Sequence, residues 1–224
     1  MMSEQARSPT RQFLEALFAN KPEELRILVW TIADKCSRWF RDVESAILYA
    51  ESTIRQDVYF GVGLSGRDYG PDHRCPSKEI AAIGGLWVDI DLRSDAHPKT
   101  TLPCSVEEAL SILPTNLPPT FIIFTGNGIH VWLLFRELYL FRNNEDRAAA
   151  AILARRWNTL IRDNALMRGW KIDMLHDLAR VLRIPGTTNC KDPTNPKPVV
   201  IEAQSDHRYH PSDLARYLGQ IGRP

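Results

Sequence analysis

The sequence lacks the features of several common protein classes. It contains only four cysteines among 224 residues, and these lie far apart with no Cys-x-x-Cys pair. We therefore expect neither a disulfide framework nor a structural zinc site, and free thiols suit a reducing cytoplasm. No apolar run approaches the ~20 residues of a membrane-spanning helix, and no signal peptide is recognisable. The expectation is a cytoplasmic protein with no membrane partner.

An excess of charge of one sign is also lacking. Lys and Arg total 28 against 27 for Asp and Glu, which gives a formal net charge of +1. Any surface that binds nucleic acid must therefore be a local basic patch. The Gly-x-x-x-x-Gly-Lys-[Ser/Thr] pattern of a P-loop ATPase is missing, and so is the His-x-His pair of rolling-circle nucleases.

Hydrophobic periodicity and turn residues predict an α+β chain with a mixed or antiparallel sheet. Helices are expected where apolar residues recur at helical spacing, and strands where they alternate or run together. The expected helices are 10–19, 43–54, 105–113, 144–167, 178–182 and 212–218. Caps are expected at Asp42, Ser105 and Asn144, and one apolar stripe of the long helix is expected to contain Leu153, Trp157, Leu160 and Ile161. The expected strands are 27–32, 58–64, 86–92, 121–125, 129–135 and 198–203. Hairpins are mixed with helices without regular βα alternation, which argues against a doubly wound parallel sheet.

The strongest chemical signal lies in the strand expected at 86–92. Its apolar residues at 86, 88, 90 and 92 are expected to face the core, which places Asp89 and Asp91 together on the other face, roughly 6.5–7 Å apart. Two carboxylates in an apolar strand are costly unless a cation binds them, and Mg²⁺ or Mn²⁺ prefers carboxylate oxygens. The alternative is two ordinary surface aspartates on a solvated face, although aspartate is disfavoured in strands.

A second signal is the expected hairpin around Gly126-Asn127-Gly128, because Asn-Gly between apolar runs favours a tight turn. His130 follows this turn, and a histidine in an apolar strand is often a satisfied core residue. The small residues of the turn favour another interpretation, since they let a ligand approach the backbone closely. A histidine beside them can hydrogen-bond a phosphate.

The third segment begins with Asp173, where residues 170–174 alternate as in a short strand. Asp177, Arg180 and Arg183 follow, and then a turn reading Pro-Gly-Thr-Thr-Asn-Cys-Lys at 185–191. Arginine binds phosphate through two parallel hydrogen bonds and lysine acts as a point charge, so the segment can form a triphosphate clamp. The alternative is an amphipathic helix with an Asp177–Arg180 pair.

Together the three segments resemble the archaeo-eukaryotic primase (AEP) superfamily, especially the primase-polymerases of plasmids, phages and mobile elements. The matching motifs are Val-Asp-Ile-Asp at 88–91, Thr-Gly-Asn-Gly-Ile-His at 125–130 and Ile-Asp-Met at 172–174. Residues 178–191 are similar to the replication-initiator branch, and the whole resemblance spans about 57–203. The sequence departs from the family at Thr125, where many relatives have Ser, and in having no recognisable zinc-binding insertion.

The resemblance implies an RRM-like catalytic lobe packed on a smaller N-terminal α/β lobe. In a single domain over 1–224, the N-terminal lobe would span about 10–56, the catalytic lobe 57–203 and a C-terminal helix 204–224. The implied activity joins dNTPs or NTPs to a primer on a single-stranded DNA template, with two Mg²⁺ or Mn²⁺ ions held by Asp89, Asp91 and Asp173. The implied nucleotide-binding residues are His130, Arg180, Arg183, Asn189, Lys191, Thr125 and Gly128. A separate or fused helicase is a further expected partner.

Three other functions remain open. A metal-dependent nuclease or relaxase also uses carboxylates and histidine, and a nucleotide-sugar transferase can use Asp-x-Asp to hold a metal–diphosphate. A non-catalytic RRM-type module would bind nucleic acid through exposed aromatic residues on its sheet. Candidates for a basic DNA-binding surface are Arg67, Arg74, Lys78, Arg155 and Arg156.

Overall fold

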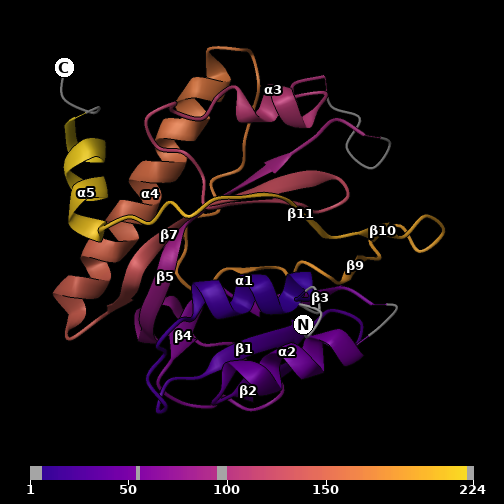
Figure 1. The fold of residues 1–224 in the computed structure, drawn as a ribbon, viewed down its shortest axis with the longest axis vertical. Coiled ribbons are helices and arrows are strands. Elements are labelled where there is room, and N and C mark those ends of the chain that lie inside the picture. The colour runs from indigo at the N-terminus through magenta and orange to yellow at the C-terminus, as the bar shows by residue number, and fades with distance from the viewer. Residues whose placement is uncertain (1–6, 54–55, 95–99, 221–224) are drawn as a thin grey trace, which may run out of the picture.

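A five-stranded antiparallel sheet forms the centre of the larger lobe in the computed structural model, which describes residues 7–53, 56–94 and 100–220 (Figure 1). Its strand order is β11-β6-β7-β5-β4. The strands are β4 (Gly63–Ser65), β5 (Ile80–Asp91), β6 (Phe121–Phe124), β7 (Gly128–Leu140) and β11 (Val200–Gln204). The short helix η1 (Ser77–Glu79) leads into β5, the longest strand but one.

Helix α4 (Asn144–Leu166) packs on β5, and α5 (Pro211–Gln220) packs on α4. The stripe predicted for α4 is confirmed, since Leu153, Trp157 and Ile161 are buried. The expected cap at Asn144 is wrong by one residue, because the Asn143 side chain accepts the hydrogen bond from the Asp146 amide. The remaining helix of this lobe, α3 (Val106–Leu110), is capped by Ser105 and lies near β7.

The smaller lobe contains a four-stranded antiparallel sheet of order β2-β1-β3-β8. Its strands are β1 (Ile27–Thr31), β2 (Cys36–Phe40), β3 (Val58–Gly61) and β8 (Val181–Arg183), and its helices are α1 (Pro9–Leu17) and α2 (Val43–Ser52). Residues 58–61, which the sequence placed at the start of the catalytic lobe, thus pair with β1 and with β8. This pairing brings β8, from late in the chain, beside the N-terminal segment.

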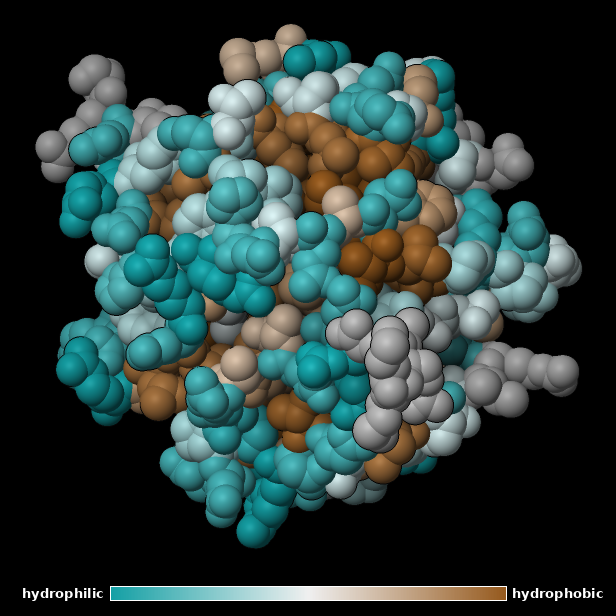
Figure 2. All heavy atoms as spheres, viewed as in Figure 1, coloured by the Kyte–Doolittle hydropathy of each residue, from teal (hydrophilic) through white to brown (hydrophobic). Residues whose placement is uncertain are grey.

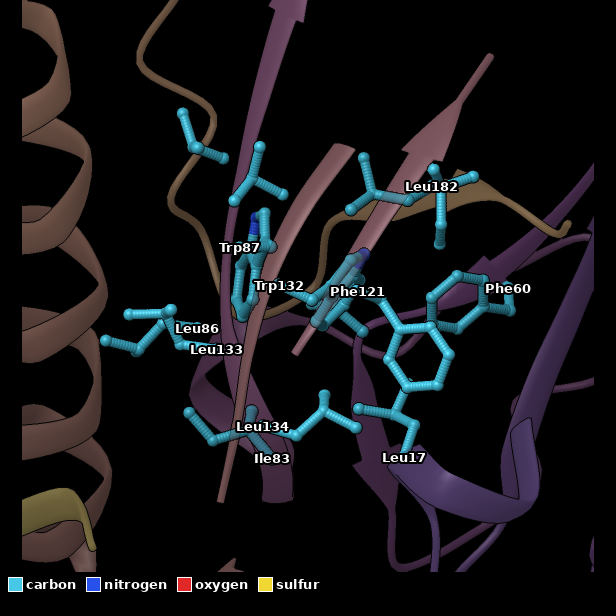
Figure 3. Close-up of a cluster of buried hydrophobic side chains, with 14 of the residues drawn as sticks. Leu17, Phe60, Ile83, Leu86, Trp87, Phe121, Trp132, Leu133, Leu134 and Leu182 are labelled. Atoms are coloured by element: carbon cyan, nitrogen blue, oxygen red, sulfur yellow. The ribbon is translucent and has the colours of Figure 1, made fainter. Parts of the chain in front are cut away.

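An aromatic cluster joins the two lobes (Figure 3). Phe13 of α1 lies edge-on to Phe60, Phe121 and Trp132, with ring centroids 5.3 to 5.4 Å apart. Trp132 also lies 5.9 Å from Trp87, and both tryptophans are fully buried. Such aromatic pairs add about 0.5–1.5 kcal/mol each beyond the burial of their area. The same sheet face that carries Trp87 and Trp132 carries Asp89 and His130 one pleat further on.

Several secondary-structure predictions were wrong. The helix expected at 178–182 is absent, because residues 181–183 form strand β8, and the strand expected at 170–174 is an irregular segment. The strand expected at 58–64 is divided between two sheets as β3 and β4, and β2 was not predicted. Strand β5 begins six residues before the expected start at residue 86. Here Gly84 permits a close approach of α1, since a Cβ atom would lie 2.2 Å from the Leu17 carbonyl oxygen.

The surface of the molecule is largely hydrophilic in the view of Figure 2, where the apolar residues are divided into separate patches. Among residues 7–53, 56–94 and 100–220, no helix has the length and apolar character needed to cross a membrane.

Candidate active site

Strands β5 and β7 bring Asp89, Asp91 and His130 together, just beyond the Trp87–Trp132 pair of the aromatic cluster. In their antiparallel register Asp89 lies opposite His130, and Asp91 lies opposite Gly128. The Nε2 atom of His130 is 3.8 Å from Oδ1 of Asp89, whose side chain is 25% exposed. The two aspartate side chains lie on the same face of β5, as the alternation of the sequence predicts. The preceding residue on this face, Trp87, is fully buried.

Charged groups from three segments act on Asp89. Burial, and after it repulsion from Asp91, raises the pKa of this carboxyl to about 7. Arg183 and Arg180 act in the opposite direction, while Asp173 adds a smaller repulsion. The structure thus brings these two arginines and Asp173 within electrostatic reach of Asp89. A carboxylate pair held in this way favours either a proton or a cation between its members.

His130 is a neutral residue with an unused polar atom. Burial, together with the positive charge of Arg183, lowers the pKa of the His130 imidazole to about 3. The side chain is 3% exposed, and its Nδ1 atom is buried without a hydrogen-bond partner among the described residues. Buried polar atoms are nearly always paired in folded proteins. His130 therefore differs from a satisfied core histidine and has an atom to offer to a ligand.

Arg183 is held in place by Asp57, a residue that the sequence analysis missed. The Arg183 Nε and Nη2 atoms both donate to Oδ1 of Asp57, at 3.0 and 2.7 Å. The guanidinium carbon lies 4.9 Å from the centroid of the Tyr59 ring. Asp57 also accepts a hydrogen bond from the Cys190 amide at 3.2 Å. An aspartate before an apolar strand is a weak sequence signal, and its partner lies 126 positions away.

Asn189 connects the third sequence segment to the turn between β6 and β7. It belongs to the short hairpin of β9 (Thr188–Asn189) and β10 (Lys197–Pro198). Its buried amide donates to the Thr125 carbonyl oxygen at 2.6 Å and accepts from the Lys191 amide at 3.0 Å. The end of the third segment and the turn after β6, separate in sequence, are thus in direct contact. The Asn189 amide itself is used within the protein, so its role in nucleotide binding stays a prediction.

Packing explains the glycines of this turn. Gly126 has a φ of +89°, and a Cβ atom there would lie 2.7 Å from Cβ of Lys197. At Gly128 a Cβ atom would lie 2.7 Å from the Ile90 carbonyl oxygen of the neighbouring strand. Both positions require glycine for the fold alone. The small residues therefore do not by themselves indicate a ligand, and the role of the turn depends on His130.

The third expected metal ligand is less well placed than the first two. Asp173 lies in the irregular segment 170–177. Within the described part of the chain, no three His, Cys, Asp or Glu side chains are grouped closely enough to hold a metal ion. Asp177 pairs with Arg180, whose Nε and Nη2 atoms donate to it at 2.9 and 2.5 Å. The alternative pair expected from sequence is thus present, although no helix carries it.

Comparison of the whole chain with known proteins gives matches in structure only. The sequence matches no protein-family model and no curated protein. The AEP domain of the cyanophage S-2L primase-polymerase superposes with a TM-score of 0.54 at 16% identity, over 87% of this chain and 88% of that domain. This chain has the AEP fold. The expected α+β architecture is therefore confirmed.

Two further AEP-fold matches involve the primase RepB′. Its catalytic domain, in complex with initiator DNA, superposes with a TM-score of 0.52 at 16% identity, over 95% of both chains. Another structure of primase RepB′ gives a TM-score of 0.53 at 16% identity, over 95% of this chain and 62% of that one. All three relatives are similar to this chain over nearly its whole length.

The five basic residues expected to bind DNA lie in different places on the AEP fold. Arg67 pairs with Glu79 at 2.8 Å and lies over the Tyr69 ring. Arg74 lies over the Trp30 ring of the small lobe. Lys78 and Arg155 line one groove beside α4. Arg156, one residue further along α4, faces α5 near Gly219. Of the five, Lys78 and Arg155 are placed in one groove, and the role of all five in DNA binding stays a prediction.

Proposed function

We propose that this chain is the catalytic core of a primase-polymerase of the AEP superfamily, which adds nucleotides to a DNA strand on a single-stranded template. The observation that supports it best is the convergence of Asp89, Asp91, His130 and Arg183 at one end of the large sheet, in a fold shared with primase-polymerases. An RRM-type binding module is less well supported, because Trp87 and Trp132 on this sheet face are buried rather than exposed for stacking.

Asp89 and Asp91 are suited to hold Mg²⁺ or Mn²⁺. Magnesium is commonly bound by one or two carboxylates together with substrate phosphates. Burial and the charge of Asp91 raise the pKa of Asp89, which means that they disfavour its charged form. A bound cation would offset this cost, because a nearby opposite charge favours the carboxylate. Two bound ions would supply Lewis-acid stabilisation of the attacking and leaving oxygens. Asp173 is proposed as a third ligand that joins the pair after a local shift of the irregular segment 170–177.

The groups around the aspartate pair are suited to bind the incoming dNTP or NTP. Arg183, fixed by Asp57, presents a rigid guanidinium, and Arg180 lies beside it in electrostatic reach of Asp89. Neutral His130 donates a hydrogen bond to a phosphate oxygen through the ring nitrogen that carries its proton. Lys191 adds a point charge for the triphosphate. Thr125, Gly128 and Asn189 form the wall behind these groups.

Extension of a labelled primer on a single-stranded template, with Mg²⁺ or Mn²⁺ and either dNTPs or NTPs, tests the proposal. We expect added nucleotides with the wild-type protein and none with Asp89→Ala or Asp91→Ala. Asp163→Ala is the matched control, since that carboxylate is exposed on α4 and contacts only Arg162 among the described side chains. Primer shortening in place of extension would favour the nuclease. Full extension by both site variants would contradict the proposed site.

A further inference from the structure

A groove of about 700 Å³ lies beside the N-terminal half of α4, apart from the aspartate pair. Lys78 in η1 lines one side, Arg147 and Arg155 of α4 line another, and residues 176–178 close the third. Its volume falls within the ~300–1,000 Å³ range that is usual for ligand sites. None of the expected catalytic or nucleotide-binding residues is among its described lining residues, although Arg180 pairs with the lining residue Asp177.

The groove has an excess of positive charge. The side chains of Lys78 and Arg155 make no hydrogen bond or ion pair within the described residues, although Lys78 lies in electrostatic reach of Glu79. Arg147 is fixed through its Nε atom, which donates to the Ile80 carbonyl oxygen at 2.7 Å. Asp177, the one carboxylate in the lining, is already paired with Arg180. Three cations thus face a groove whose only carboxylate is neutralised, so an anionic ligand fits it best.

An apolar strip runs between these cations. Ala148 and Ala151 lie three residues apart on one face of α4, and Ile152 beside them is 52% exposed. Leu178 lies in the opposite wall but is only 2% exposed, so the strip is formed by α4. Single-stranded nucleic acid is bound by cations that contact its phosphates, and its bases stack on aromatic side chains or on arginine guanidinium planes. The described lining of this groove supplies two arginines and no Phe, Tyr or Trp, so its apolar strip contacts sugars and bases without aromatic stacking. The arrangement of this groove fits that ligand, whereas a free phosphate would leave the apolar strip unused.

One segment connects the groove to the aspartate pair. The Trp87 indole, two residues before Asp89 on β5, donates to the Leu175 carbonyl oxygen at 2.7 Å. His176 and Asp177 follow and line the groove, and the Nδ1 atom of His176 is buried without a partner among the described residues. Asp177 in turn holds Arg180, which acts on Asp89. A strand in the groove therefore lies next to the site where nucleotides would be added.

We propose that this groove binds single-stranded nucleic acid, with phosphates on Lys78, Arg147 and Arg155 and bases on the α4 strip. This inference deepens the proposed function by assigning a path for the template strand. It assigns no role to Arg67, Arg74 or Arg156.

Binding of a fluorescent single-stranded oligonucleotide, measured by anisotropy at several salt concentrations, tests the groove. Lys78→Ala combined with Arg155→Ala removes two charges whose side chains make no hydrogen bond or ion pair among the described residues. Each lost phosphate contact lowers the slope of log affinity against log salt by about 0.7, so we expect a slope smaller by about 1.4. Arg41→Ala combined with Arg216→Ala is the charge-matched control, because both arginines are exposed and neither lines the groove. Equal slopes and affinities in the two double variants would overturn the proposal.

A second variant tests the apolar strip. Ala151→Glu introduces a carboxylate between the cations at a helix position that tolerates Glu, so oligonucleotide affinity should fall while the melting temperature stays unchanged. Binding of a labelled dNTP should be unaffected in Ala151→Glu and in the Lys78/Arg155 double variant. A parallel loss of dNTP affinity would overturn the assignment to a nucleic-acid strand. If the wild-type protein binds the strand through this groove but extends no primer, the groove stands and the proposed function fails.

Discussion

Removal of the Asp57 carboxylate is expected to affect both the stability of the small lobe and the binding of nucleotide. Asp57 and Arg183 have side chains that are 7% and 16% exposed, so the pair is screened little by water. Asp57→Ala leaves the arginine and the Cys190 amide without their acceptor. Removing one member of such a buried pair costs about 3–5 kcal/mol. For a chain of this length the loss corresponds to a fall in melting temperature of roughly 6–20 °C.

The functional consequence separates Asp57 from a purely structural residue. Asp57→Asn keeps an acceptor oxygen of the same shape, so it should cost less stability, but it removes the charge that fixes the Arg183 guanidinium. We expect the KM for dNTP to rise in Asp57→Asn with a smaller change in kcat, because Arg183 is proposed to bind the triphosphate. Thermal unfolding followed by circular dichroism and steady-state primer extension measure the two effects.

Glu44→Ala is the control for stability, because the Glu44–Arg11 pair also has two hydrogen bonds and lies in the same lobe, yet its carboxylate is 52% exposed. An exposed pair contributes about 0–1 kcal/mol. If Asp57→Ala melts no lower than Glu44→Ala, the buried pair does not form in solution. An unchanged KM in Asp57→Asn would refute the positioning role of Asp57.

Three further predictions concern the site. Mg²⁺ or Mn²⁺ should raise the melting temperature of the wild-type protein, and the shift should vanish in a variant with Asp89→Asn and Asp91→Asn; a shift kept by that variant would place the metal elsewhere. His130→Ala should weaken binding of a labelled dNTP more than binding of a template oligonucleotide, whereas equal losses would indicate damage to the fold. Asp173→Asn should be inactive but stable, while Asp177→Asn should remain active and melt a few degrees lower, since it loses the ion pair with Arg180. The reverse pattern in activity and melting temperature would make Asp177 the third ligand.

Elements with strong local signals were predicted from the sequence. The caps at Asp42 and Ser105 and the hairpin at 126–128 formed as expected, because hydrogen bonds within a few residues determine them. The common face of Asp89 and Asp91 follows from strand alternation alone. The resemblance of three motifs to AEP proteins identified the fold although the structural relatives share only 16% identity.

Tertiary pairing decided the rest. Residues 178–182 have apolar residues at a spacing that suits a helix, yet residues 181–183 become β8 because β3 offers an edge to pair with. That same pairing places Arg183 beside Asp57, which no local pattern connects. The tertiary structure also determines which basic residues share a groove. Arg155 lines the groove with Lys78 of η1, whereas its neighbour Arg156 points toward Gly219 of α5. The sequence by itself therefore determined the local elements and the acidic pair. The groups around those aspartates depend on contacts between distant segments, such as the Arg183–Asp57 pair whose members lie 126 positions apart, and local conformational preferences carry no information about such contacts.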